Sequence, residues 1–253
     1  MMPKLFAVAA LISATIAANV MAMDQADFTD YVWGRTGDGS LVHRVSIGTA
    51  YDIESGKILA RVEGHEVAMT IPSMAEPGTV YHIARAMLLY RDPESDAVLA
   101  VYPGSDPDVQ TGVSAYSHVD GDFVWRLGNP ANGTPPRTVA ERVDCERQGS
   151  VLYCVLSASY DTEAGIKTLE YRWTVDRTAS SPEAAARVEF AEIKPLTPGV
   201  SERPLLLRLT SYRASAWEAV PTTLRLWIET EAPGFATLPV DAPALVKAAG
   251  FAP

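Results

Sequence analysis

Alternation of apolar and polar residues constrains the fold of this chain more than any other feature. In KTLEYRWTV (167–175), every second residue from Leu169 to Val175 is apolar, and the residues between them are polar or charged. Successive side chains of a strand point to opposite faces, so this period of two predicts an antiparallel strand with one buried face. Comparable segments lie at 29–36, 41–51, 57–63, 65–71, 79–91, 96–102, 112–119, 122–128, 186–194 and 204–213.

Turn sequences separate these segments, and helical patterns are scarce. The stretches 50–60, 89–100 and 159–169 each place a tyrosine before an acidic turn and then return to alternation, as β-hairpins do. DAPALVKAAG (241–250) has an Asp cap, a Pro in the first turn and a Gly stop, which predict a short C-terminal helix; 217–229 is ambiguous. The sequence predicts an all-β fold, a large antiparallel meander in a closed or nearly closed β-barrel, with a sandwich as the alternative.

The N-terminus resembles a secretory signal peptide. Lys4 precedes an apolar stretch from Leu5 to Ala18, and Val20 and Ala22 fit the −3 and −1 positions of a cleavage site. The stretch is short for a membrane span, which needs about 20 apolar residues. We expect residues 1–22 to be removed and residues 23–253 to form a single β-rich domain, periplasmic or secreted from a bacterium; an uncleaved anchor or lipid attachment is the alternative.

The formal net charge of −10 argues against nucleic acid as a partner, because an acidic surface repels phosphate backbones and no basic stripe offsets it. No segment after the N-terminal one is apolar enough to predict a membrane span. The oligomeric state is left open by the sequence.

Cys145 and Cys154, the only cysteines of the chain, flank a Gly149-Ser150 turn. A two-residue hairpin with glycine first pairs residue 148 with 151 and therefore Cys145 with Cys154. In a non-hydrogen-bonded pair the Cα atoms lie about 4.5 Å apart, within reach of a disulfide, and an oxidising compartment favours that bond. We expect a structural disulfide in a hairpin whose first strand covers 137–148.

Familiar catalytic signatures are absent. GHEVAM (64–69) begins like a zinc-protease helix but has Met69 in place of the second histidine; no G-x-S-x-G occurs, and GRTGDGS (34–40) lacks the spacing and lysine of a phosphate loop. His43 lies on an apolar strand face, and a bulge after Gly64 would re-aim His65. Neither residue specifies a metal ligand set, so the sequence assigns no metal and no cofactor.

The clearest candidate binding surface is SAYSHVDGDFVWRL (114–127). Its Asp-Gly turn pairs His118 with Phe123 and Tyr116 with Trp125, which places all four on one face of a hairpin. An aromatic face with a histidine can line a pocket for an apolar or aromatic molecule, or it can be an ordinary cross-strand cluster.

The strand YHIARAMLLYRD (81–92) supplies a second candidate. His82, Ala84, Ala86, Leu88 and Tyr90 share a face on which two small residues lie between polar ends, as in the interior of a ligand-holding barrel. The opposite face carries Arg85 and Arg91, and either face could be internal.

HIARAMLLYRDPESDAVLAVYPG (82–104) resembles a segment of an uncharacterised bacterial family, domain of unknown function 1838. The resemblance is carried by Tyr90, Asp92 and Pro93, and SAWEAVPTTLRLWIETEAPG (215–234) is vaguely similar to the C-terminal region of the family. It implies an exported, β-rich domain and carries over no site residues.

The leading hypothesis is an exported β-barrel that binds a small apolar or aromatic molecule through Tyr116, His118, Phe123 and Trp125. One alternative is a cofactor-independent enzyme in the same cavity, with His118 or His82 as general base and Tyr90 or Tyr116 as proton donor. The other is a structural or interaction module with a solid core.

Overall fold

The computed structural model describes residues 39–102, 111–119, 122–131, 133, 135–162, 165–176, 178, 186–239 and 241–253. Within these residues the chain forms a 12-stranded antiparallel sheet. Its strands are β1 (Val42–Asp52), β2 (Ile58–Pro72), β3 (Thr79–Arg91), β4 (Val98–Tyr102), β5 (Thr111–Val119), β6 (Asp122–Gly128), β7 (Arg137–Ala140), β8 (Asp144–Gln148), β9 (Val151–Thr162), β10 (Gly165–Asp176), β11 (Ala186–Lys194) and β12 (Leu205–Ala214). The helices η2 (Trp217–Ala219), α3 (Thr222–Glu231), η3 (Pro233–Phe235) and α4 (Ala242–Ala248) follow β12.

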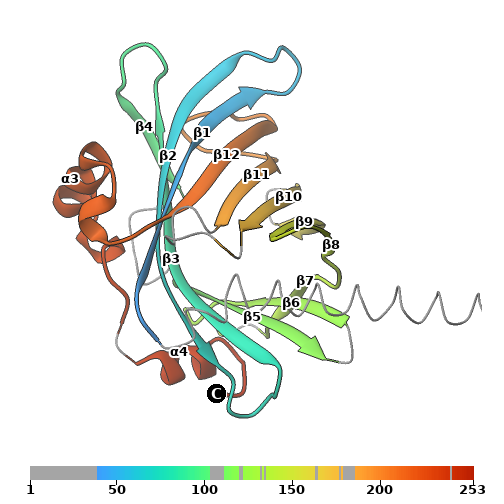
Figure 1. Ribbon diagram of the computed structural model, residues 1–253. Coiled ribbons are helices and arrows are strands. Elements are labelled where there is room, and N and C mark those ends of the chain that lie inside the picture. The colour runs from blue at the N-terminus through green and yellow to red at the C-terminus, as the bar shows by residue number, and fades with distance from the viewer. Residues whose placement is uncertain are drawn as a thin grey trace, which may run out of the picture.

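The strand order is β7-β6-β5-β3-β2-β1-β12-β11-β10-β9-β8, with β4 paired to β3 outside this path. The first strand, β1, therefore lies beside the last, β12, in the middle of the sheet, and the two edge strands β7 and β8 are consecutive in the chain. The sheet curls into a half-barrel (Figure 1). This is the antiparallel, nearly closed meander that the alternation predicts.

Side-chain packing joins the two edges of the half-barrel. Among the described pairings, β7 pairs only with β6 and β8 only with β9, so no ladder connects β7 to β8. Val139 and Ala140 of β7 nevertheless belong to the same buried cluster as Leu152 and Leu156 of β9. Buried apolar surface therefore replaces hydrogen bonds where the barrel does not close.

Glycines at two inward positions allow neighbouring strands to approach closely. A Cβ atom on Gly48 of β1 would lie 1.9 Å from the carbonyl oxygen of Arg208 in β12. A Cβ atom on Gly64 of β2 would lie 2.5 Å from a methyl carbon of Leu88 in β3. A side chain at either position would force neighbouring atoms to move, which explains glycine within these strands.

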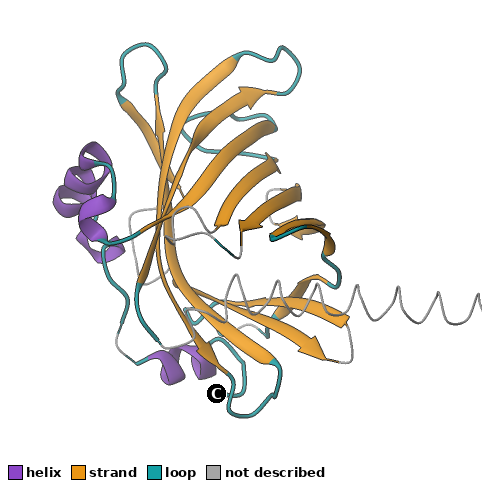
Figure 2. Ribbon diagram, in the orientation of Figure 1, coloured by secondary structure: helices purple, strands orange, loops and turns teal. Residues whose placement is uncertain are grey.

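The helices cover the outer face of the sheet, as Figure 2 shows. Leu224 and Ile228 of α3 pack with Val45, Met87 and Leu89 of the sheet. Helix α4 and the residues that follow it pack in the same way on β3 and β5, where Ala242, Val246, Ala249 and Phe251 are buried with Tyr81, Ile83, Val113 and Ala115. The outward side chains of β3 are therefore buried under helices, and its inward side chains face the half-barrel.

Several local predictions are confirmed. The acidic turns form the β1–β2, β3–β4 and β9–β10 hairpins, and the first two use the same device, because Asp52 and Asp92 each accept the backbone N–H of the serine three residues later. Asp241 accepts the backbone N–H of Ala244 at the start of α4, and Gly250 has a φ of 84° after it. The ambiguous segment 217–229 contains η2 and most of α3.

Two strand predictions are wrong. Residues 57–63 and 65–71 form the single strand β2, because Gly64 and His65 pair in unbroken register with Ser46 and Val45; the register shift lies instead between Ala50 and Tyr51. The stretch 137–148 is not one strand, because it contains β7, which pairs with β6, and β8, which pairs with β9. Residues 141–143 carry the chain from one edge of the half-barrel to the other.

The predicted disulfide is present. Cys145 pairs with Cys154 and Gln148 with Val151, and the two cysteine Cα atoms lie 4.1 Å apart. Gly149 has a φ of 64°, which the first residue of such a turn requires. The bond fastens the edge strand β8 to β9, and it fits an oxidising compartment.

The expected signal peptide, residues 1–22, and the expected strand at 29–36 lie outside the described residues. Among the helices described, none is long and apolar enough to cross a bilayer.

Replacing both cysteines by alanine should lower the free energy of unfolding by about 2–3 kcal/mol, because the disulfide closes only a short loop in the unfolded chain. Guanidinium chloride unfolding measures the difference. Dithiothreitol should destabilise the wild-type protein by the same amount and leave the double variant unchanged. Two titratable thiols in the unreduced wild type would contradict the bond.

Candidate functional site

The concave face of the half-barrel contains a cavity of about 360 Å³. Residues of β1, β2, β3, β5, β6, β9, β10, β11 and β12 line it, most of them at inward positions, together with Tyr102 of β4. Ligand sites usually occupy about 300–1,000 Å³, so the space suits a small organic molecule. On β3 the lining residues include Ala84 and Ala86, whose small side chains leave the space open.

Stacked aromatic rings form one wall of the cavity. Tyr116 and Trp125 stack with ring centroids 5.8 Å apart, and Trp125 meets the edge of Tyr171 at 5.9 Å. Tyr171 in turn stacks on Trp173 at 5.1 Å and contacts Phe190 at 4.7 Å. Because Trp125 belongs to β6 and Tyr171 to β10, this aromatic row spans the two arms of the half-barrel.

A charged group lies on another side of the cavity. Glu66 Oε1 is 2.8 Å from Arg44 Nη1 and 3.4 Å from His82 Nε2, and His82 Nδ1 lies 3.3 Å from Thr70 Oγ1. Burial raises the pKa of Glu66, but Arg44 and His82 outweigh it and lower the pKa to about 2. Glu66 is therefore a carboxylate at neutral pH, paired with a cation inside the protein.

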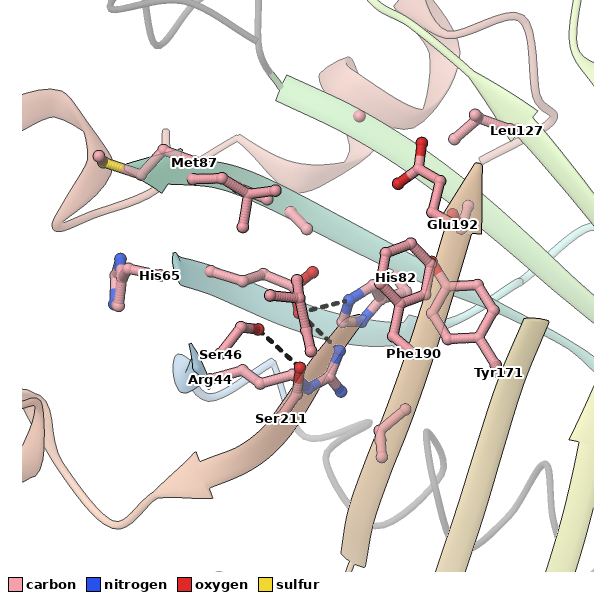
Figure 3. A pocket seen from close by; sticks show the side chains of 18 of the residues that line it. Arg44, Ser46, His65, His82, Met87, Leu127, Tyr171, Phe190, Glu192 and Ser211 are labelled. Carbon is pink, nitrogen blue, oxygen red and sulfur yellow. Dashed lines mark hydrogen bonds and ion pairs between the residues drawn. The ribbon is translucent and has the colours of Figure 1, made fainter. Parts of the chain in front are cut away.

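Hydroxyl groups extend this polar region. Ser46 and Ser211, on the adjacent strands β1 and β12, share a hydrogen bond of 2.6 Å. Trp125 Nε1 donates to Ser114 Oγ at 3.1 Å, which holds the indole in the aromatic row. In Figure 3, Arg44, Ser46 and Ser211 lie close together, apart from Tyr171 and Phe190.

A second charged group occupies the end of β11. Lys167 Nζ and Glu192 Oε1 form an ion pair of 2.5 Å. Lys194, two residues beyond Glu192, also lines the cavity, and its side chain extends over the ring of Tyr102. The cavity therefore has an aromatic row between two charged regions.

The predicted aromatic face is confirmed for three of its four residues. β5 and β6 pair Tyr116 with Trp125 and His118 with Phe123, as the Asp-Gly turn predicts. Tyr116, Phe123 and Trp125 are buried in one cluster, and Tyr116 and Trp125 line the cavity while Phe123 packs behind them. The side chain of His118 lies outside the described residues, so its candidate roles remain predictions.

The residues predicted on β3 divide between two environments. His82, Ala84, Ala86 and Leu88 line the cavity, so the face that carries them is internal, whereas Arg85 is buried on the outer face and donates to Thr111 Oγ1 at 2.8 Å. Tyr90 is buried in a neighbouring cluster with Leu88 and Tyr102. His82 and Tyr116 lie near each other, with ring centroids 6.5 Å apart.

His43 and His65 lie beside each other on the adjacent strands β1 and β2, and His65 is also among the residues that line the cavity. Their rings stack with centroids 5.3 Å apart, and both contact the indole of Trp217 in η2. In the described part of the chain, no group of three or more His, Cys, Asp or Glu side chains is arranged to hold a metal ion.

The sequence reading missed Arg44, Glu66, Glu192 and Lys194. All four occupy inward positions of their strands. Arg44 shares a face of β1 with Ser46, Glu66 shares a face of β2 with Val62, and Glu192 and Lys194 share a face of β11 with Val188 and Phe190. The sequence therefore contained a sign of the site, namely charged residues on the same strand face as apolar ones. It could be recognised only after deciding which face of each strand points inward.

No protein-family model matches the chain, and no curated protein sequence matches it. The resemblance of residues 82–104 to domain of unknown function 1838 therefore stays a prediction.

Stability should fall between pH 7 and pH 5 because of His65. Burial lowers the pKa of this histidine to about 4, and His43 lowers it further than Glu66 raises it. Since the unfolded chain binds the proton below about pH 6.5 and the folded chain only below about pH 4, acid favours unfolding. We expect a loss of about 2 kcal/mol over this interval, measured by urea unfolding.

The variant His65→Gln is the matched control, because glutamine keeps a polar side chain that does not titrate. Its free energy of unfolding should change clearly less between pH 7 and pH 5. An equal loss in both proteins would assign the effect to other groups.

Proposed function

We propose that this protein is an exported binding protein, periplasmic or secreted, that holds a small molecule with an apolar or aromatic body in the half-barrel cavity. The observation that carries the proposal is the cavity beside the stacked rings of Tyr116, Trp125 and Tyr171. In a solid core these rings would be packed on all sides, whereas here they border open space. The disulfide supports the exported location.

The lining favours a ligand that is mostly apolar with a few polar groups. The aromatic row offers ring faces and edges, which attract a planar ring in stacked or edge-on contact. Arg44 and Glu66 neutralise each other, so the charged region beside β1 and β2 can orient a ligand without requiring a charge on it. Few polar groups placed around an apolar wall are typical of small-molecule sites.

A cofactor-independent enzyme is the second candidate, favoured by the contact of His82 with Glu66 inside the cavity. A carboxylate that orients an imidazole is a common arrangement for a general base. Both ring nitrogens of His82 have partners, Glu66 and Thr70, so catalysis would require one contact to be exchanged for substrate. His82→Gln separates the candidates: it should abolish turnover by an enzyme and leave a binding protein able to bind.

Filling the cavity should abolish binding. Ala86 faces the cavity opposite Glu66 and remains exposed, so Ala86→Phe would place a ring in the open space. A neutral aromatic probe, N-phenyl-1-naphthylamine, should quench wild-type tryptophan fluorescence saturably, and Ala86→Phe should weaken its binding by at least about tenfold. Trp125→Phe should remove most of the quenched signal, because Trp125 lines the cavity.

Ala97→Phe is the matched control, since Ala97 lies in the exposed turn between β3 and β4. It should bind the probe like the wild type. If wild type, Ala86→Phe and Ala97→Phe all bind the probe equally, the probe lies elsewhere and the cavity is not the binding site.

A further inference from the structure

Among the described residues, two buried donors without acceptors lie near the end of β11: the amine of Lys194, which lines the cavity, and the hydroxyl of Tyr90, which does not line it. Lys194 is 2% exposed, and its Nζ has no hydrogen-bond partner among the described residues. Tyr90 is fully buried, and within the same part of the chain its hydroxyl also has no partner. Buried polar groups are normally hydrogen-bonded, so two unpaired donors in one region require an explanation.

The surroundings of Lys194 hold the amine without supplying an acceptor. Its Nζ lies 3.1 Å from the ring centroid of Tyr102 and 5.7 Å from that of Tyr90. Ring faces attract an ammonium group but do not satisfy its three N–H donors. Lys194 lines the cavity, so the missing acceptor can come from a molecule bound there.

We propose that Lys194 receives the carboxylate of a small amphipathic acid whose apolar body lies along the aromatic row. This inference rests on the binding function proposed above and names the chemical class of the ligand. A carboxylate offers about four lone-pair sites, so it can accept more than one of the N–H donors of the ammonium group.

The local charge balance favours a monoanion. Glu192 is already paired with Lys167 at 2.5 Å, which leaves Lys194 as the cation without a bonded carboxylate in this group. A phosphate dianion would need a second free cation, whereas one carboxylate matches one ammonium. Burial lowers the pKa of Lys194 to about 7 despite the opposing effect of Glu192, and a bound carboxylate would restore its charge.

The geometry also sets the shape of the ligand. Phe190 lies on the same face of β11 as Glu192 and Lys194, four residues before Lys194. At about 3.3 Å per residue, the aromatic row begins about 13 Å from Lys194. An acid with a short flexible chain between its carboxylate and its ring system fits this separation.

The test compares 4-(naphthalen-1-yl)butanoic acid with its primary amide, which has nearly the same shape and no charge. Calorimetry at pH 6.5 should show the wild type binding the acid more tightly than the amide. Lys194→Met should weaken acid binding by about 10- to 100-fold and change amide binding by less than about threefold. Tyr90→Phe, which removes only a hydroxyl outside the cavity lining, should change acid binding by less than about threefold.

Lys57→Met, at an exposed lysine in the β1–β2 turn, is the matched control and should bind both probes like the wild type. If Lys194→Met binds the acid as tightly as the wild type, or loses acid and amide equally, the carboxylate site is refuted while the cavity remains a binding site. If neither probe binds the folded wild type, the binding function itself is refuted, and the carboxylate site with it.

Discussion

The pairing of β1 with β12 supports the rest of the structure, because it joins the first and last strands of the meander in the middle of the sheet. Their ladder runs from His43 opposite Ala214 to Asp52 opposite Leu205. It brings Ser46 and Ser211, which are 165 residues apart, within 2.6 Å. Loss of this ladder would separate the half-barrel into two arms and divide the cavity between them, whereas loss of an edge strand would leave the centre intact.

The two faces of the sheet differ in what covers them: helices pack on the outer face, and the concave face borders the cavity. Helices α3 and α4 bury the outward residues of β3, such as Ile83, while inward residues such as Trp173 and Leu209 belong to buried apolar clusters on the concave side. The inward residues Ala84 and Ala86 leave space instead. Because the helices and these clusters already bury apolar surface, part of the concave face can carry polar and charged groups without removing the core.

Charges on the concave face are arranged unequally at its two ends. Arg44, Glu66 and His82 satisfy one another, which removes much of the cost of burying a carboxylate. At the β11 end, Lys167 and Glu192 are paired, whereas the Lys194 amine has no partner among the residues that the structure describes. A paired group can be explained by stability, since removing one partner leaves the other charge buried without a partner. An unpaired buried amine cannot be explained in that way, and it is the feature that most directly suggests a ligand.

Local sequence determined the hairpins, their registers, the disulfide and the terminal helix, because turn dipeptides, alternation and caps act over a few residues. The pairing of Cys145 with Cys154 and of Tyr116 with Trp125 followed from the turns alone. Only the tertiary structure decided that residues 137–148 divide between the two edges, and which face of each strand points inward. It also decided that Glu66 and Lys194 line one cavity, since these contacts join strands that are distant in sequence and depend on the curl of the whole sheet.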